Sequence, residues 1–104
     1  MAQKINVSAL ADRDVDECAE YLAKRNFDAA LRFLKAVNRT YERIGLFPGS
    51  GSPRYAHLPM LERLRCMPVP EFEQYLVFYL EYPTRCEVVR VLHCSRDLPE
   101  ILQE

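Results

Sequence analysis

Hydrophobic residues recur at helical spacing through the first half of the 104-residue chain. A short alternating segment around Ile5 and Val7 comes first and predicts a strand that stops at Ser8, a residue type favoured at helix N-caps. An apolar stripe follows and predicts an amphipathic helix ending near Lys24; the stripe consists of Ala11, Val15, Cys18, Ala19 and Leu22.

A second amphipathic helix is indicated after a turn at Asn26 and Asp28, which also supply a new N-cap. Pro48 and Gly49 end its pattern. Because two amphipathic helices joined by a short link must both bury their apolar stripes, we expect an antiparallel hairpin packed on another element. The apolar face of the second helix consists of Ala30, Phe33, Leu34, Val37, Tyr41 and Ile44, and the opposite face of Arg32, Lys35, Arg39 and Arg43.

The second half of the chain changes to alternating periodicity. Residues 48–60 hold two of the three glycines and three of the seven prolines, which predicts a surface loop. Strands are then expected at residues 61–69, 73–82 and 86–93, with a tight turn between the last two. The middle strand is apolar on both faces, so we expect it to be central and the sheet face away from the helices to await a partner.

These elements predict an α+β fold in a single domain spanning residues 1–104. The expected order is an N-terminal strand, a two-helix antiparallel hairpin, an antiparallel sheet of three further strands and a short C-terminal helix (β-α-α-β-β-β-α). Asp97 and Glu100 match a capping box for that last helix.

Composition narrows the classes of function. The formal net charge of -1 provides no general basic excess, so direct binding of nucleic acid is not expected. No stretch is apolar enough to cross a membrane and the N-terminus lacks a secretory signal, so we expect a cytoplasmic protein. The four cysteines show neither CxxC pairs nor histidine partners, which favours reduced, structural thiols and predicts no metal or cofactor.

Several local motifs resemble one bacterial family in order and spacing. Ser8 with Ala11, Asp14 and Tyr21 resembles the family's first helix, and the segment from Ala29 to Gly51, with its Pro-x-x-Gly exit, resembles the second. Leu64 and Arg65, followed by the run from Tyr75 to Tyr79, match the next two strands. The most specific match is the strand ending VRVLHCSRD at residues 89–97. Together these motifs resemble the ParE/RelE toxin superfamily of type II toxin–antitoxin systems, in its ParE-like branch.

The resemblance implies a toxin neutralised by a cognate antitoxin in a hetero-oligomer. ParE-like members bind DNA gyrase and so stop DNA replication, whereas RelE-like members cut messenger RNA on the ribosome. Leu76 and Leu102 stand where RelE-like toxins carry an arginine and a tyrosine, which favours the gyrase-directed branch without an enzymatic reaction of its own. The alternatives are a ribosome-dependent endoribonuclease that uses Arg65, His93 and Arg96, or a binding module of this fold without toxicity.

Two surfaces are expected to carry the function. The gyrase-binding surface is placed at the end of the last strand and the terminal segment: Arg90, His93, Arg96, Asp97 and Leu102. The antitoxin-binding surface is placed on the basic helix face and the sheet: Arg32, Lys35, Arg39, Arg43, Tyr75 and Tyr79. For some of these residues a structural interpretation competes with the role in binding. His93 can simply bond to backbone at a strand end, Asp97 can serve as a helix cap, and the basic stripe can be a solvated face.

Overall fold

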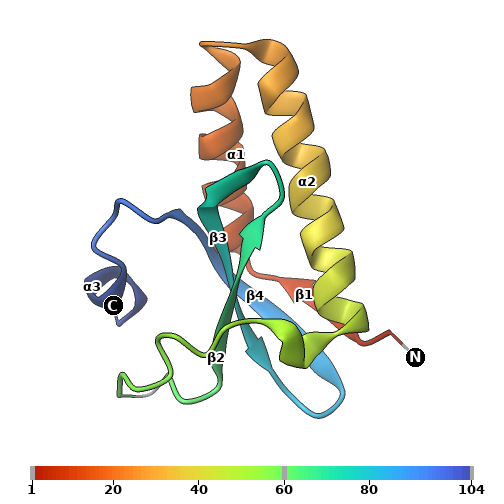
Figure 1. Ribbon diagram of the computed structural model, residues 1–104, viewed down its shortest axis with the longest axis vertical. Helices are drawn as coiled ribbons and strands as arrows, with labels where there is room; N and C mark the ends of the chain where they lie inside the picture. Colours follow the sequence, from red (N-terminus) through yellow and green to blue (C-terminus); the bar gives the residue numbers. More distant parts are fainter. Residues whose placement is uncertain (1, 60, 104) are drawn as a thin grey trace.

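The computed structural model describes residues 2–59 and 61–103, and it confirms the predicted order of elements. Strand β1 (Lys4–Val7) leads into the helices α1 (Ala9–Ala23) and α2 (Phe27–Leu46). A 3-10 turn, η1 (Pro48–Ser50), is followed by β2 (Leu64–Val69), β3 (Phe72–Glu81), β4 (Arg85–His93) and α3 (Leu98–Leu102). The two long helices stand side by side, and the turn between them projects beyond the sheet (Figure 1).

Both helix starts follow from the predicted N-caps. The Ser8 hydroxyl accepts a hydrogen bond from the Ala11 amide at 3.0 Å, and the Asn26 side-chain oxygen accepts one from the Ala29 amide at 3.2 Å. Each bond satisfies one of the amides that the first helical turn leaves without a partner. The hairpin therefore begins and turns where the local sequence indicated.

The sheet has the strand order β1-β4-β3-β2. The three C-terminal strands pair antiparallel, and β3 lies between β4 and β2 as predicted. Strand β1 adds to the outer side of β4 in parallel, with Lys4 opposite Arg85 and Val7 opposite Val88, so the sheet is mixed. The prediction that β2 begins at residue 61 was wrong, because the Leu64 amide bonds back to the Leu61 carbonyl in a turn.

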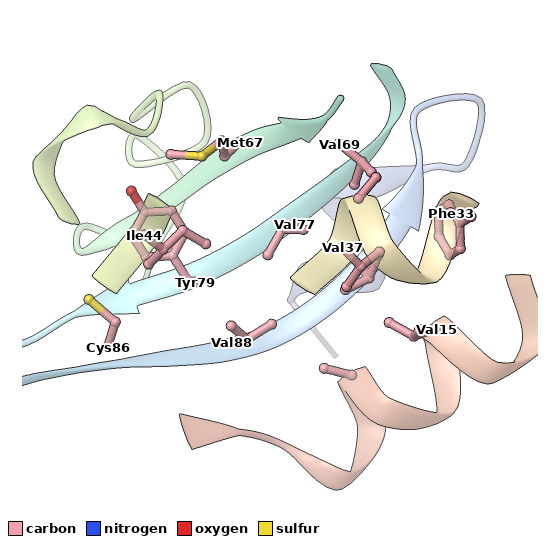
Figure 2. Close-up of a cluster of buried hydrophobic side chains, with 13 residues drawn as sticks. Val15, Phe33, Val37, Ile44, Met67, Val69, Val77, Tyr79, Cys86 and Val88 are labelled. Carbon is pink, nitrogen blue, oxygen red and sulfur yellow. The ribbon is translucent and has the colours of Figure 1, made fainter. Parts of the chain in front are cut away.

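The main core lies between the helical hairpin and one face of the sheet. Phe33, Val37 and Ile44 from α2 meet Val77 and Tyr79 from β3, and Val15 closes the cluster from α1 (Figure 2). Burial of this much apolar surface is the principal force that holds the helices to the sheet.

The second face of the sheet is also covered, contrary to the expectation that it awaits a partner. Leu76, Phe78 and Leu92 are buried there beneath Tyr55 of the long loop and Leu98 of α3. The long loop and α3 therefore cover the apolar side chains on this face of the sheet.

No helix in the described ranges 2–59 and 61–103 has both the length and the hydrophobicity to cross a membrane.

Candidate functional site

A cleft of about 300 Å³ lies between α1 and the end of β4. Glu17, Tyr21, Tyr75, His93 and Arg96 line it, so two members of the expected gyrase-binding surface come together there. Glu17 and Tyr21 were not anticipated. Their spacing from Asp14 at i+3 and i+7 places all three on one side of α1, and this pattern could have indicated them.

A buried ion pair supports the floor of this cleft. The Arg90 guanidinium donates to both carboxylate oxygens of Asp14, from Nε at 2.8 Å and from Nη2 at 3.0 Å. The same carboxylate accepts the Val91 amide at 3.0 Å. The side chains are 17% and 7% exposed for Arg90 and Asp14 respectively, so the pair mainly ties α1 to β4. Asp14 was missed as a buried residue although it interrupts the apolar stripe of α1 between Ala11 and Cys18.

The ring of His93 is held on both nitrogens. Its Nδ1 accepts the Ser95 backbone amide at 3.0 Å, which requires that the proton sit on Nε2 and donate to the Gln74 side-chain oxygen at 3.1 Å. The ring of Tyr75 contacts it edge-on with centroids 4.9 Å apart. This geometry agrees with the structural interpretation of His93 as a histidine bonded to backbone at a strand end.

The remaining residues of the expected gyrase-binding surface differ in accessibility. Arg96 and Asp97 are exposed, and Leu102 is half-buried in a hollow of about 290 Å³ with Leu10 and Val89. Asp97 occupies the N-cap position of α3, but its side chain makes no capping hydrogen bond, so the predicted capping box was wrong. The Asp97 backbone lies outside the extended conformation typical of a capping residue, with φ -75° and ψ 83°.

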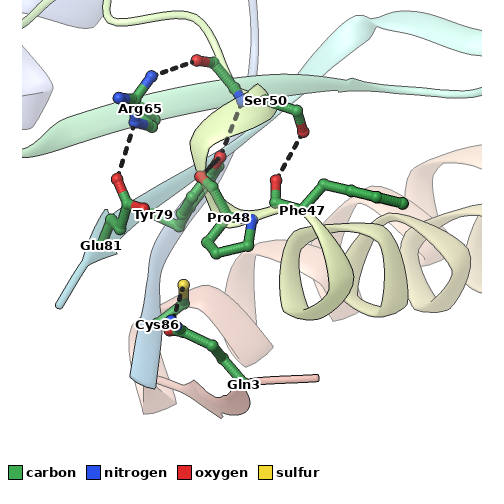
Figure 3. Close-up of polar contacts among 9 residues, drawn as sticks. Gln3, Phe47, Pro48, Ser50, Arg65, Tyr79, Glu81 and Cys86 are labelled. Atoms are coloured by element: carbon green, nitrogen blue, oxygen red, sulfur yellow. Dashed lines mark hydrogen bonds and ion pairs between the residues drawn. The ribbon is translucent and has the colours of Figure 1, made fainter. Parts of the chain in front are cut away.

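Arg65 belongs to a separate polar cluster at the other end of the sheet. It donates to Glu81 from Nε at 3.2 Å and to the Gly51 carbonyl at 2.8 Å (Figure 3). The strand pairing places Arg65 opposite Tyr79 and His93 opposite Tyr75. Four residues of β3, or about 13 Å along the strand, therefore separate the two positions. The structure does not bring together the three residues of the ribonuclease alternative.

The start of the long loop is anchored by Tyr79. Its hydroxyl donates to the Pro48 carbonyl at 2.6 Å and accepts the Gly51 amide at 3.0 Å (Figure 3). Burial raises the pKa of this hydroxyl, which therefore stays protonated and able to donate. Tyr79 is fully buried, so its expected place on the antitoxin-binding surface was wrong: the side chain has no exposed area to offer.

The other residues expected to bind antitoxin lie mainly on the outer face of α2. Arg32 forms ion pairs with Asp28 at 3.1 Å and Glu71 at 3.4 Å, while Lys35, Arg39 and Arg43 are exposed. Tyr75 is half-buried because its ring packs on Phe33, with centroids 5.1 Å apart. Lys35, Arg39 and Arg43 therefore present their charges to solvent, whereas the charge of Arg32 is paired with two carboxylates.

The four thiols differ in their accessibility. Burial, with a smaller contribution from the Asp14 and Glu17 charges, raises the pKa of Cys18 to about 11, and burial also raises the pKa of Cys66 and Cys86. Cys94 is the exposed cysteine. Within the described ranges, no group of three or more histidine, cysteine or acidic side chains could hold a metal ion.

We therefore expect iodoacetamide to alkylate one thiol quickly at pH 8. With a pKa of about 11, roughly one Cys18 thiol in a thousand is thiolate at that pH, and buried Cys66 and Cys86 are shielded from the reagent. Mass spectrometry should locate the fast adduct on Cys94, and Cys94→Ser should abolish the fast phase while Cys18→Ser keeps it. Rapid alkylation of the Cys94→Ser protein would contradict this arrangement.

The helical hairpin on a four-stranded mixed sheet also occurs in a solved structure. A chain from the solved structure of the chromosomal ParDE toxin–antitoxin system of P. aeruginosa superposes with a TM-score of 0.72 at 12% sequence identity, over 88% of this chain and 96% of that one. That likeness establishes the fold.

The sequence itself establishes the family. Residues 5–98 match the model of the ParE toxin of the type II toxin–antitoxin system parDE, and the chain belongs to this family of toxins. The resemblance found from the motifs is thereby confirmed. The sequence matches no curated protein.

Proposed function

We propose that this toxin binds DNA gyrase, stops DNA replication, and is neutralised by a cognate antitoxin in the bacterial cytoplasm. Membership of the ParE toxin family supports the proposal. One observation favours this proposal over the ribonuclease alternative: Arg65 lies far from His93. Each of the two side chains is also held by hydrogen bonds within the protein.

Ribonuclease chemistry would require a base for the 2′-hydroxyl proton and cations beside the developing phosphorane charge. His93 is poorly suited to the first task, because Nδ1 already accepts the Ser95 amide and Nε2 carries the proton bonded to Gln74. Arg65 is unsuited to the second, because Glu81 neutralises it at the far end of the sheet. A binding role demands neither feature.

The gyrase-binding surface is proposed at the cleft beside the end of β4. Arg96 is its principal cation, because Arg90 is committed to Asp14 and only slightly exposed. Asp97 and the half-buried Leu102 extend the surface towards α3. An exposed arginine next to aromatic side chains is a frequent anchor for a carboxylate of a protein partner.

The antitoxin is proposed as the second partner. The P. aeruginosa chain of the same fold comes from a toxin–antitoxin system, and the family to which this chain belongs is that of the parDE toxins. By the same logic this chain would form a hetero-oligomer with its cognate antitoxin, and co-expression of that antitoxin should relieve growth arrest.

Pulse-labelling after induced expression in bacteria tests the proposed target. We expect thymidine incorporation to fall first while amino-acid incorporation continues, because gyrase is needed at once for replication. Translation collapsing first would favour the ribonuclease, and no effect in cells that express the protein well would favour a non-toxic binding module.

Arg96→Ala should weaken inhibition of purified gyrase in a supercoiling assay. We expect the inhibitory concentration to rise by about tenfold or more, the loss typical of an arginine anchor at an interface. Arg63→Ala, which removes another exposed arginine, is the matched control and should inhibit like the parent toxin. Equal inhibition by the Arg96→Ala and parent proteins would contradict the proposed surface.

A further inference from the structure

The cleft beside the end of β4 carries charges of opposite sign on its two walls. Glu17 lies on the α1 wall, and Arg96 lies on the other wall, just beyond the last residue of β4. Burial, and then the charges of Asp14 and Glu17, raise the pKa of Cys18 to about 11, whereas the charge of Arg96 acts to lower it. Because Glu17 and Arg96 act in opposite directions on one thiol that lines the cleft, both charges lie near the same point of it.

These two charges are available to a partner. None of the ion pairs found among residues 2–59 and 61–103 includes Arg96. Glu17 pairs with Arg13 at 3.8 Å, where the side chains are 68% and 72% exposed, and an exposed pair at that distance contributes little. The other carboxylate of the cleft, Asp14, is already bonded to Arg90. The cleft therefore offers one anion and one cation.

The backbone holds both charges in place. The Arg96 amide donates to the His93 carbonyl at 3.1 Å, and the Cys94 amide donates to the Gln74 carbonyl at 2.7 Å, so the turn after β4 is fixed to β3. Glu17 lies within the 15-residue helix α1. A surface that is ordered before binding loses less conformational entropy when a partner docks.

Aromatic side chains line the same cleft. Tyr21, one helical turn after Glu17, is 50% exposed, and the ring of Tyr75 contacts that of His93. The volume of about 300 Å³ is at the lower end of the range for small-ligand sites, about 300–1,000 Å³. The cleft therefore admits side chains of a partner but not a whole helix, which is about 10–12 Å wide.

We propose that Glu17 is a second contact residue of the gyrase-binding surface and gives that surface a polarity. The matching segment of gyrase carries an acidic side chain that pairs with Arg96, a basic side chain that pairs with Glu17, and an apolar side chain that packs on Tyr21. A segment with its charges in the reverse order is repelled at both contacts. The proposal rests on the proposed function, because it takes gyrase as the target.

Reversing the two charges singly and together tests this polarity. Binding of gyrase holoenzyme to the immobilised toxin is measured by surface plasmon resonance, with inhibition of supercoiling in parallel. Glu17→Arg and Arg96→Glu should each weaken binding by about tenfold or more, because like charges then face each other. The double variant keeps the net charge of the parent but should lose about hundredfold or more, since both contacts become repulsive.

Asp16→Arg and Arg63→Glu are the matched controls. They make the same charge changes at exposed positions outside the cleft, and Asp16 lies on the opposite side of α1. Each control should bind gyrase within about twofold of the parent. Circular dichroism should show the parent fold in every variant, because all four positions are exposed.

The other outcomes separate this proposal from the proposed function. If the double variant binds like the parent, only net charge matters, and the polarity is refuted while gyrase remains the target. If Glu17→Arg binds like the parent and Arg96→Glu does not, Glu17 is not a contact residue. A parent toxin that sediments as a dimer, and that either single reversal makes monomeric, would mean that a second copy of the chain occupies the cleft. A parent toxin that does not bind gyrase would overturn the polarity together with the proposed target.

Discussion

Replacing Asp14 with alanine is expected to lower the free energy of unfolding by about 3–5 kcal/mol, because the change removes one partner of a largely buried ion pair that ties α1 to β4. The Val91 amide also loses its acceptor. For a chain of this length the loss corresponds to a fall in the melting temperature of more than about 12 °C. Thermal unfolding followed by circular dichroism, with urea titration, measures both quantities.

A double variant measures the cost of removing only one partner of the ion pair. Asp14→Leu combined with Arg90→Met replaces both partners with apolar side chains, so the loss should shrink to about 1–3 kcal/mol, chiefly from the unpaired Val91 amide. A double variant as unstable as Asp14→Ala would show that loss of the carboxylate beside the Arg90 charge is not the main cause of the instability. Arg13→Ala, which breaks only an exposed ion pair at 3.8 Å, should change stability by less than about 0.5 kcal/mol.

Gly51→Ala should destabilise the protein by about 1–3 kcal/mol, because the added methyl group has no space. It would overlap the Tyr79 hydroxyl and stand 2.8 Å from Cε1 of the same ring, closer than side-chain carbons approach. Tyr79→Phe should cost about 2–3 kcal/mol, because the Pro48 carbonyl and the Gly51 amide both lose their partner. Urea unfolding of each single variant gives these values.

The double variant tests whether the two effects share one contact. Removing the hydroxyl relieves the closest overlap but leaves Cζ within 2.9 Å of the new methyl group, so Tyr79→Phe with Gly51→Ala should cost about 1 kcal/mol less than the sum. Gly49→Ala is the matched control, since the nearest atom to its methyl group is Glu81 Oε2 at 4.0 Å. Strict additivity of the two changes would mean that the Tyr79 hydroxyl does not limit the space around Gly51.

Local sequence signals predicted the elements well, because their causes are local. Ser8 and Asn26 cap helices through amides three residues away, and the strands alternate as their residues do. Pairing partners distant in sequence were not accessible to this reasoning. The residues around Ile5 carry no signal for parallel pairing with Cys86. The loop sequence likewise carries no signal that Tyr55 covers the second face of the sheet.

The site residues were predicted less well, because residue type does not reveal which groups are already satisfied. Arg90 and Arg96 look alike in sequence, yet one is held by Asp14 and the other is exposed. Tyr75 and Tyr79 share a strand and a face, but the loop after α2 closes over Tyr79 alone. A carboxylate within an apolar stripe, as at Asp14, was the one signal in the sequence that could have indicated the buried pair.

The parallel pairing of β1 with β4 has a consequence for the time course of biosynthesis. Lys4 pairs with Arg85, so the first strand to be synthesised must wait for 81 further residues before its partner exists. At about 5–20 residues per second, that wait lasts about 4–16 seconds. The nascent chain therefore exposes an incomplete sheet until β4 has been synthesised.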